Sequence, residues 1–370
     1  MPKDLSRFKE NPPESICLLR LSAIGDVTHA LPIVHTLQKV WPKTRITWVI
    51  GKLEASLVGD LPGVRFITFD KSRGYKAYFD LRKKMANETF DILLHMQVAV
   101  RASLASLWIK APIKLGFDKA RARDNQSLFT NARIAAKPNQ HVLDGFFCFL
   151  EALGIEKKEM CWDIPVPHQA LQFAEEQLPG DQPIMVINPC SSNRSKNWRN
   201  WSISNYADLA DYAAQTYGYR VVLTGGPDKM EIDYGQQIAE TSESPIINLI
   251  GKTSLKQLIA VLSRASLTIS PDTGPAHMSV AAGTPVIGLY ASSNPERTGP
   301  YNYLDLVVNR YPQALEHFDN RKESEVKWGQ RVRDPKVMDQ ISLEDVKAQL
   351  DRFQAGEWRT SAPCDPPEKP

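Results

Sequence analysis

Residues 16–50 decide the fold, and they read ICLLRLSAIGDVTHALPIVHTLQKVWPKTRITWVI. The stretch Ile16 to Leu21 is a short apolar run that predicts a buried strand. Apolar residues then recur at helical spacing as far as Pro42, which ends the helix. We expect this helix to begin near Thr28 or later, since Pro32 is tolerated only in a first turn. Another strand follows, and a βαβ unit of this kind is typical of a parallel sheet.

The alternation of strands and helices continues along the chain and falls into two series. The first series ends near residue 165 and the second begins near residue 183, with a proline-rich stretch between them. We therefore predict an α/β protein with two doubly wound, Rossmann-like domains that face a central cleft. In such sheets ligands bind beyond the carboxyl ends of the strands, so we expect the site in that cleft.

The two series also predict the domain boundaries. The expected parts are an N-terminal domain over 1–165, a linker over 166–182, a C-terminal domain over 183–340, a final helix over 341–356 and a disordered tail over 357–370. The final helix opens with a capping-box pattern at Ser342, and we expect it to pack back on the N-terminal domain.

Composition gives few clues to a partner. The chain has 370 residues, 42% hydrophobic and 24% charged, and its net charge of +3 gives no reason to expect nucleic acid. The five cysteines lie far apart without a metal-ligand pattern, which is cytosolic usage. The start of the chain resembles no secretory signal, and no window approaches the roughly 20 apolar residues of a transmembrane helix. We expect a cytoplasmic protein without a transmembrane segment.

Basic residues are concentrated in two stretches of the sequence. The first contains Lys71, Arg73, Lys76, Arg82, Lys83 and Lys84, and the second contains Lys110, Lys114, Lys119, Arg121 and Arg123. The simplest interpretation of either stretch is a solvated face, and we favour it for the first.

The first candidate site is the segment from Ser270 to His277, which reads SPDTGPAH between a predicted strand and a predicted helix. Pro275 suits a first helical position, Thr273 suits an N-cap, and Gly274 allows a ligand to approach the backbone. Because the N-terminus of a helix presents free N–H groups and a partial positive charge, this turn predicts a phosphate site. An ordinary capped turn fits the pattern equally well. Asp272 would repel a phosphate, so we expect its carboxylate to accept sugar hydroxyl groups.

Three further segments lie between a predicted strand and a predicted helix. The first of them covers residues 22–26, and its Asp26 is either a helix N-cap or a general base. Residues 188–198 carry hydroxyl groups, amides and two cations that suit diphosphate oxygens, although a polar surface loop has the same composition. Gly225 and Gly226, which lead to Glu231, permit tight packing of strand and helix with or without a ligand.

Several well-known motifs are absent from the sequence. The first strand-to-helix turn has no Gly-x-Gly-x-x-Gly, which argues against a dinucleotide-dependent enzyme. There is no Gly-x-x-x-x-Gly-Lys-Ser/Thr phosphate loop and no Asp-x-Asp pair to hold a metal on a diphosphate. We therefore expect neither a metal nor a cofactor. Of the seven histidines, His277 in the first candidate site is the one we single out.

Four segments of the chain together resemble the ADP-heptose:lipopolysaccharide heptosyltransferases of glycosyltransferase family 9, the heptosyltransferase I type most of all. They are Leu19 to Val27, Lys196 to Trp198, Gly225 to Glu231 and Ser270 to His277, within a likeness that extends from about Ile16 to Tyr301. The first and last segments are specific to the family, and the other two are looser. The resemblance implies a GT-B fold and an inverting glycosyltransferase that uses no metal.

The resemblance also implies roles for individual residues. Asp26 would be the general base that deprotonates the acceptor hydroxyl, and Lys196 would offset charge on the departing ADP. The implied donor-binding residues are Ser191, Ser192, Lys196, Glu231, Asp272, Thr273, Gly274, Pro275 and His277. The basic stretch after Gly116 is similar to the acceptor loop of the family, and its candidate contacts to an anionic acceptor are Lys119, Arg121 and Arg123.

The implied reaction moves heptose from ADP-L-glycero-D-manno-heptose to the Kdo region of the lipopolysaccharide inner core. The N-terminal domain would bind a Kdo-bearing lipid A at the inner membrane, and the C-terminal domain would bind the ADP-sugar. A peripheral position on the cytoplasmic face of that membrane is compatible with this reaction. The alternatives are transfer to an existing heptose, a nucleotide-sugar-binding protein without catalysis, and a nicotinamide-dependent dehydrogenase. The polar stretch from Asn309 to Gln340 is longer than this family leads us to expect, and forms either a loop over the acceptor or a surface elaboration.

Overall fold

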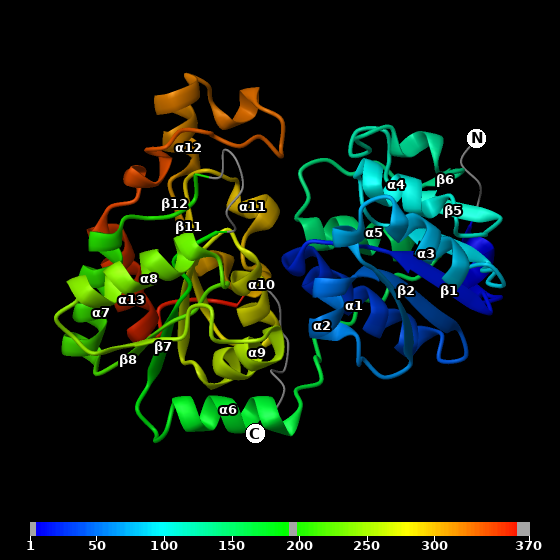
Figure 1. The fold of residues 1–370 in the computed structure, drawn as a ribbon. Coiled ribbons are helices and arrows are strands. Elements are labelled where there is room, and N and C mark those ends of the chain that lie inside the picture. Colours follow the sequence, from blue (N-terminus) through cyan, green and yellow to red (C-terminus); the bar gives the residue numbers. More distant parts are fainter. Residues whose placement is uncertain (1–4, 192–197, 361–370) are drawn as a thin grey trace. The chain divides into compact units, whose positions relative to one another are not determined.

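The chain folds into two compact units in a computed structural model that describes residues 5–191 and 198–360 (Figure 1). The first unit covers Met1–Pro165 and the second covers Val166–Pro370. Each unit contains one six-stranded sheet in which every pair of neighbouring strands is parallel. Because parallel strands need crossover connections, helices separate most of the strands along the chain.

The sheet of the first unit has the strand order β3-β2-β1-β4-β5-β6. Its strands are β1 (Ser15–Leu19), β2 (Arg45–Gly51), β3 (Val64–Phe69), β4 (Ile92–His95), β5 (Ile113–Gly116) and β6 (Ala132–Arg133). The helices are α1 (Ile24–Val40), α2 (Lys52–Val58), α3 (Lys76–Lys84), α4 (Val100–Ser106) and α5 (Val142–Ala152). Short 3₁₀ helices lie at Ser6–Lys9, Lys71–Arg73 and Gln126–Leu128.

The sheet of the second unit has the strand order β12-β11-β10-β7-β8-β9. Its strands are β7 (Ile184–Ile187), β8 (Arg220–Leu223), β9 (Ile246–Asn248), β10 (Leu267–Pro271), β11 (Val286–Tyr290) and β12 (Val308–Asn309). The longer helices are α6 (His168–Gln177), α7 (Ile203–Tyr217), α8 (Lys229–Thr241), α9 (Leu255–Arg264), α10 (Gly274–Ala281) and α13 (Leu343–Gln354). The shorter helical segments are α11 (Pro295–Thr298), Tyr301–Leu306, α12 (Tyr311–Ala314), Leu315–Asp319, Glu323–Glu325 and Val337–Gln340.

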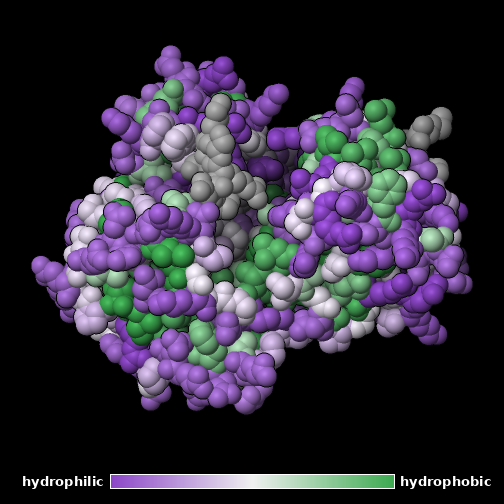
Figure 2. All heavy atoms as spheres, viewed as in Figure 1, coloured by the Kyte–Doolittle hydropathy of each residue, from purple (hydrophilic) through white to green (hydrophobic). Residues whose placement is uncertain are grey.

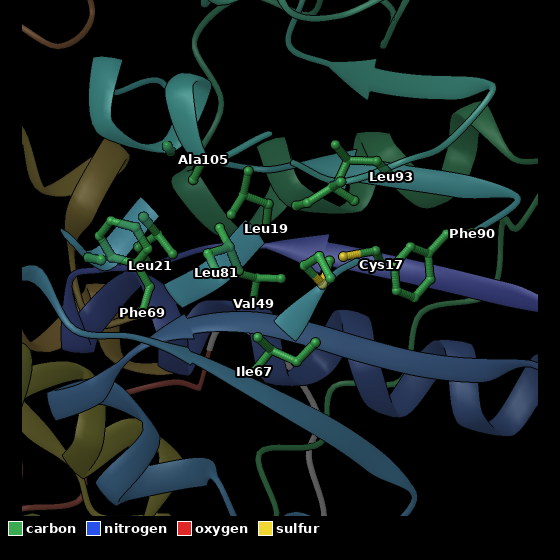
Figure 3. Packing of buried hydrophobic residues seen from close by; sticks show 14 residues of the cluster. Cys17, Leu19, Leu21, Val49, Ile67, Phe69, Leu81, Phe90, Leu93 and Ala105 are labelled. Atoms are coloured by element: carbon green, nitrogen blue, oxygen red, sulfur yellow. The ribbon is translucent and has the colours of Figure 1, made fainter. Parts of the chain in front are cut away.

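One face of the first sheet is buried under α3 and α4 (Figure 3). Alternate residues of β1 point to the same face of the sheet, which places Cys17 and Leu19 beside Leu93 of β4. The inner side chains of the two helices, among them Leu81 and Ala105, belong to the same buried cluster. Every residue of the central strands β1 and β4 is buried, as expected for strands of a parallel sheet covered by helices.

The first helix begins earlier than predicted. We expected a start near Thr28, but α1 begins at Ile24 and carries Pro32 in its interior. Pro32 has no N–H, so the carbonyl of Thr28 loses its usual helical donor. Leu31 and Ile33 on either side of the proline are fully buried, and α1 packs on α5. Tertiary packing therefore outweighs the local cost of the proline.

The predicted linker contains a helix, and the predicted position of the final helix needs correction. Residues 166–182 contain α6, which packs on α9 of the second unit, so much of this segment is structured. The final helix α13 packs on α7 of the second unit, whereas we expected it on the N-terminal domain. Two tyrosines of α7, Tyr212 and Tyr217, donate hydrogen bonds of 2.7 Å to Asp351 of α13. The Trp201 ring nitrogen also donates to the Ile341 carbonyl at 2.8 Å, just before this helix.

The polar segment 309–340 is structured in short pieces. It contains α12 and three further helical segments, and it forms an isolated antiparallel bridge between Arg331 and Ser293. The first described part of the expected disordered tail is also packed, since the Trp358 ring lies 5.7 Å from that of Phe353. Residues 361–370 lie outside the described residues. Across 5–191 and 198–360, no helix is both long and apolar enough to cross a membrane.

Leu93→Ala tests the core beneath α3 and α4. Because Leu93 is 0% exposed, we expect the substitution to lower the free energy of unfolding by about 2–5 kcal/mol through lost burial and a residual cavity. Leu128→Ala is the matched control, since Leu128 is 79% exposed and its removal should change stability by no more than about 0.5 kcal/mol. Urea denaturation of the full chain measures both values. Equal effects of the two substitutions would contradict this description of the core.

Candidate active site

The strand order of the first sheet reverses between β1 and β4. From β1 the chain proceeds outward to β2 and β3 on one side, and from β4 it proceeds to β5 and β6 on the other. Such a reversal leaves a crevice at the carboxyl ends of the two central strands, where doubly wound sheets bind ligands. The segment that contains Asp26 follows β1 at this point.

Hydrogen bonds join the loops that follow β1 and β4. Arg20 donates through Nη1 to the Met96 carbonyl at 2.6 Å, and the Leu21 N–H donates to Gln97 Oε1 at 2.7 Å. Gln97 Nε2 in turn donates to Ser22 Oγ at 3.1 Å. These bonds fix the turn before α1, so the side chains at the start of that helix have a defined position.

Asp26 lies in the first turn of α1, and it is not the N-cap that we considered as one alternative. The N-cap is Ala23, whose N–H donates to Asp26 Oδ2 at 3.3 Å. The same oxygen forms an ion pair with Arg20. Within the described part of the chain, Oδ1 of Asp26 makes no hydrogen bond, and the side chain is 33% exposed. A partly exposed carboxylate that is held through one oxygen can accept a proton from a bound hydroxyl group on the other.

The second sheet reverses its strand order between β7 and β10. Two of the candidate segments, the loop after β7 and the turn after β10, therefore begin at neighbouring strand ends. The Thr273 hydroxyl donates to Asn188 Oδ1 at 3.2 Å and lies 3.0 Å from Ser270 Oγ. Thr273 occupies the N-cap position of α10 but makes no capping bond with its side chain, because its hydroxyl is turned toward Asn188.

Asp272 is buried beside two arginines. Arg199 contacts it through an Nη1–Oδ2 distance of 3.1 Å and also donates to its backbone carbonyl. Arg331 lies 3.5 Å from the same carboxylate oxygen, and Ser293 donates to it at 2.9 Å. Burial by itself would raise the pKa of Asp272, but the two guanidinium groups, His277 and the Ser293 hydroxyl outweigh it and hold this pKa below its ordinary value.

The charge of this turn differs from our expectation. We assigned Asp272 to sugar hydroxyl groups because its charge would repel a phosphate. Two guanidinium groups now oppose one carboxylate, which leaves a net charge of +1 for these three side chains. The N-terminus of α10, which begins at Gly274 with Pro275 in its first turn, adds a partial positive charge. An anion can therefore approach the turn even though a carboxylate lies within it.

Glu231 lies at the start of α8 and faces the glycine pair after β8. The Gly226 N–H donates to Glu231 Oε2 at 2.6 Å. A Cβ at Gly225 would come within 2.9 Å of the same oxygen, so a side chain at this position would displace the carboxylate. Burial raises the pKa of Glu231, and the Gly226 hydrogen bond only partly opposes that effect.

Ser191 and His277 are the remaining predicted donor residues that the structure describes. Ser191 is buried, and its N–H and hydroxyl donate to Asn200 Oδ1 at 2.9 Å and 3.1 Å. His277 is 6% exposed on α10 and close enough to Asp272 to lower its pKa. Ser192 and Lys196 lie outside the described residues.

The three basic residues that we assigned to the acceptor differ in their surroundings. Arg121 is tied to the protein itself, since it pairs with Asp118 and donates to Gln140 Oε1 at 2.8 Å and to the Ala135 carbonyl at 2.7 Å. Lys119 and Arg123 instead line a hollow of about 250 Å³. Its other lining residues are Ala122, Asp124, Asn125, Gln126, Ser127 and Arg133. Three cations and one carboxylate make this hollow a candidate site for an anionic group.

Several residues of the two sites were not predicted from the sequence. Arg199 follows a quoted motif directly, so its proximity to that motif was the available signal. Arg331 lies some sixty residues beyond Asp272 in a segment of mixed charge, and Gln97 has no motif around it. In the described residues, no group of three or more histidine, cysteine or acidic side chains is arranged to hold a metal ion.

Comparison with known proteins decides the family. The model of glycosyltransferase family 9 (heptosyltransferase) matches residues 78–327, which is more than half of the chain. This chain belongs to glycosyltransferase family 9. It is 41% identical to the lipopolysaccharide core heptosyltransferase OpsX of Haemophilus influenzae, over 92% of this chain and 97% of that protein. The predicted family and the prediction of a glycosyltransferase are thereby confirmed.

Solved structures of the family share the fold. A family 9 glycosyltransferase from Veillonella parvula is similar with a TM-score of 0.76 and 24% identity, over 96% of this chain and 99% of that one. The Escherichia coli heptosyltransferase WaaC with ADP is similar with a TM-score of 0.70 and 22% identity, over 91% and 99% of the two chains. The predicted GT-B fold, with a doubly wound sheet in each unit, is confirmed by this likeness.

Arg199→Gln tests the electrostatic role of the buried pair. Arg199 is 13% exposed, and removing its charge leaves the buried carboxylate with one guanidinium group, that of the more exposed Arg331. We expect a loss of about 3 kcal/mol in the free energy of unfolding near neutral pH, and less than about 1 kcal/mol for Arg331→Gln. Urea denaturation measures both values.

The pH dependence of this loss provides a control. Because the pKa of Asp272 is lowered on folding, its ion pair stabilises the protein above the ordinary carboxyl pKa and ceases to do so as the pH falls through the lowered value. The difference between wild type and Arg199→Gln should therefore shrink in acid. Asp272→Asn, added to Arg199→Gln, should recover part of the lost stability. A loss of stability that changes neither with pH nor with the Asp272→Asn substitution would contradict the electrostatic role.

Proposed function

We propose that this glycosyltransferase moves heptose from ADP-L-glycero-D-manno-heptose to the Kdo region of the lipopolysaccharide inner core. The observation that carries the proposal is the electropositive turn at Asp272, with Arg199, Arg331 and the N-terminus of α10 around it. A departing nucleoside diphosphate needs positive charge to stabilise it, and these groups supply charge without a metal. The relative at 41% identity, a lipopolysaccharide core heptosyltransferase, supports the acceptor class. The similar WaaC structure contains ADP, which supports the nucleotide.

Transfer with inversion needs a base for the acceptor hydroxyl, and we assign that role to Asp26. The hydroxyl oxygen attacks the anomeric carbon as the bond from that carbon to the diphosphate oxygen breaks. ADP leaves with the bonding electron pair, and the hydroxyl proton passes to Asp26. Arg20 holds the Asp26 carboxylate by its Oδ2 atom, which leaves Oδ1 for the proton.

On the donor side we assign the nucleoside to Glu231 and the diphosphate to the loop after β7 and the turn after β10. The backbone amides at the start of α10 and Lys196 join Arg199 and Arg331 in this role. Asp272 itself then serves in part to orient the two arginines. Its carboxylate also accepts hydrogen bonds from heptose hydroxyl groups.

The alternative acceptor is an existing heptose of the same core. Purified protein, ADP-heptose and either Kdo-bearing lipid A or the same acceptor with one heptose attached distinguish the two. We expect ADP release and a product heavier by one heptose with the first acceptor only. Turnover restricted to the second acceptor would favour the alternative, and no ADP release with either would overturn the substrate assignment.

We also propose that the enzyme works at the cytoplasmic face of the inner membrane as a peripheral protein. The acceptor proposed here is a lipid whose saccharide alone extends into water. An enzyme that acts on it must bring its site to the membrane surface.

Asp26→Asn tests the base. Asparagine can still accept the Ala23 N–H but cannot take up a proton, so we expect kcat to fall by roughly 10²–10⁴. Binding of ADP, measured by calorimetry, should stay close to the wild-type value because the proposed donor residues are unchanged. Normal turnover by this variant would assign Asp26 to the support of the α1 turn alone.

The raised pKa of Glu231 predicts a pH effect on nucleotide binding. If the ionised carboxylate accepts nucleoside hydroxyl groups, its protonation should weaken ADP binding by about tenfold. Since the pKa is raised, this loss should begin at a higher pH than an ordinary glutamate would give. Calorimetric titration over a pH series measures it, with Glu231→Gln expected to remove that step and Glu240→Gln, farther along α8, expected to retain it. The same profile in all three proteins would contradict the assignment.

A further inference from the structure

A surface formed by α3 and α4 carries exposed apolar side chains among cations, and we refer to it as the α3–α4 face. Its apolar residues are Tyr75, Phe79, Val100, Leu104 and Leu107, which are 70%, 58%, 54%, 39% and 57% exposed. Its cations are Lys71, Arg73, Lys76, Arg82, Lys83, Lys84 and Arg101. In Figure 2, apolar spheres lie over the region of α4 with hydrophilic ones beside them.

The two helices form one continuous surface. The Tyr78 hydroxyl donates to the Arg101 carbonyl at 3.5 Å, and the Arg82 guanidinium lies 4.9 Å from the centre of the Trp108 ring. The inner side chains of both helices, such as Ala77 and Ala102, are buried against the same sheet. The exposed residues on the outer sides are therefore held in place by a common core.

The apolar residues are arranged as an amphipathic surface requires. Tyr75 and Phe79 are four residues apart, and their ring centres lie 6.3 Å from each other. Val100, Leu104 and Leu107 recur at helical spacing along one side of α4 and the turn after it. Five large exposed apolar side chains on two adjacent helices are a patch, not the scattered exposure usual on a protein surface.

Positive charge is concentrated on this face. The seven cations of the face stand against a single carboxylate, which gives the face a net charge of +6. The whole chain has a net charge of +3, so all other residues together carry −3. The carboxylate, Asp80, is itself paired with Arg73 at 2.7 Å.

We infer that the α3–α4 face binds the surface of an anionic lipid bilayer, an inference that rests on the peripheral location proposed above. Apolar side chains enter the boundary between headgroups and acyl chains, while the surrounding lysines and arginines contact lipid phosphates. The long stems of Lys76 and Lys83 can lie along the apolar layer with their charges in the headgroups. A protein interface would instead have a centre depleted in charge, and a second copy of this face would bring the same +6.

The position of the face relative to Asp26 supports a lipid partner. Val100 begins α4 three residues after Gln97, which bonds the turn before α1. The basic segment that starts at Lys71 follows directly after β3, at the carboxyl edge of the same parallel sheet. The α3–α4 face therefore begins at the sheet edge that carries Asp26, and a lipid-borne saccharide could reach that edge while its acyl chains stay in the bilayer.

Sedimentation with vesicles tests the inference and needs neither donor nor acceptor. We expect the full-length protein to bind vesicles of phosphatidylcholine with phosphatidylglycerol, to bind phosphatidylcholine alone weakly, and to be released by high salt. Phe79→Ser with Leu107→Ser should lower partitioning by roughly tenfold or more. Lys76→Glu with Lys83→Glu should lower it by about 30-fold or more, at roughly fivefold for each cation removed.

Matched controls separate the face from net charge. Lys43→Glu with Lys157→Glu changes the net charge equally, at exposed positions outside α3 and α4, and should change partitioning far less. Circular dichroism and thermal melting check that each variant is folded. No vesicle binding by wild type, or equal losses in the control pair, would overturn the inference. Loss of a dimer in the Phe79 and Leu107 variant, without a change in vesicle binding, would also overturn it and assign the face to self-association.

A transfer assay completes the test. Variants of the α3–α4 face should retain wild-type kcat on a lipid-free acceptor saccharide and lose activity on an acceptor embedded in vesicles. If wild type binds vesicles but transfers no heptose, the proposed function fails and the membrane inference stands. If transfer occurs but vesicles are not bound, the membrane inference fails and the proposed function stands.

Discussion

The reversal of strand order at the centre of each sheet is the constraint on which both candidate sites depend. Crossovers from β1 and from β4 run to opposite sides, and so do those from β7 and from β10. The loops at those strand ends are therefore left beside each other at the carboxyl edge without a helix across them. In the first unit, Gln97 accepts a hydrogen bond from the Leu21 N–H and donates one to Ser22, and these bonds fix the turn that leads to Asp26. In the second unit a bond from Thr273 to Asn188 joins the two loops.

The two sites use their charges differently. Asp26 is one-third exposed and held by a single arginine, which leaves its carboxylate accessible to a substrate proton. Asp272 is almost fully buried, and its two arginines and one hydroxyl keep it ionised. A buried carboxylate compensated in this way positions cations as much as it binds a ligand. That difference fits one carboxylate to proton transfer and the other to the organisation of an anion site.

Segments far apart in the sequence supply these cations. Arg331 reaches Asp272 because residues 331 and 332 are held against residues 292 and 293, where the Val332 N–H donates to the Ser292 carbonyl at 3.0 Å. The stretch that lengthens the second domain is thus part of the candidate donor site. The basic residues 71–84 likewise form one surface with α4, where their charge lies beside exposed apolar side chains.

The sequence by itself determined the two doubly wound units, the turns that carry Asp26 and Asp272, and the family. These features are local: strand-to-helix turns need particular residues at fixed spacing, and buried parallel strands need short apolar runs. Only the tertiary structure decided the rest. It brought Arg199 and Arg331 to Asp272 and placed α13 on α7. It also began α1 at Ile24, earlier than the position of Pro32 suggested. Each of these depends on contacts between residues distant in the chain. A turn needs particular residues at fixed spacing, whereas the pairing of distant charges leaves no pattern in the sequence.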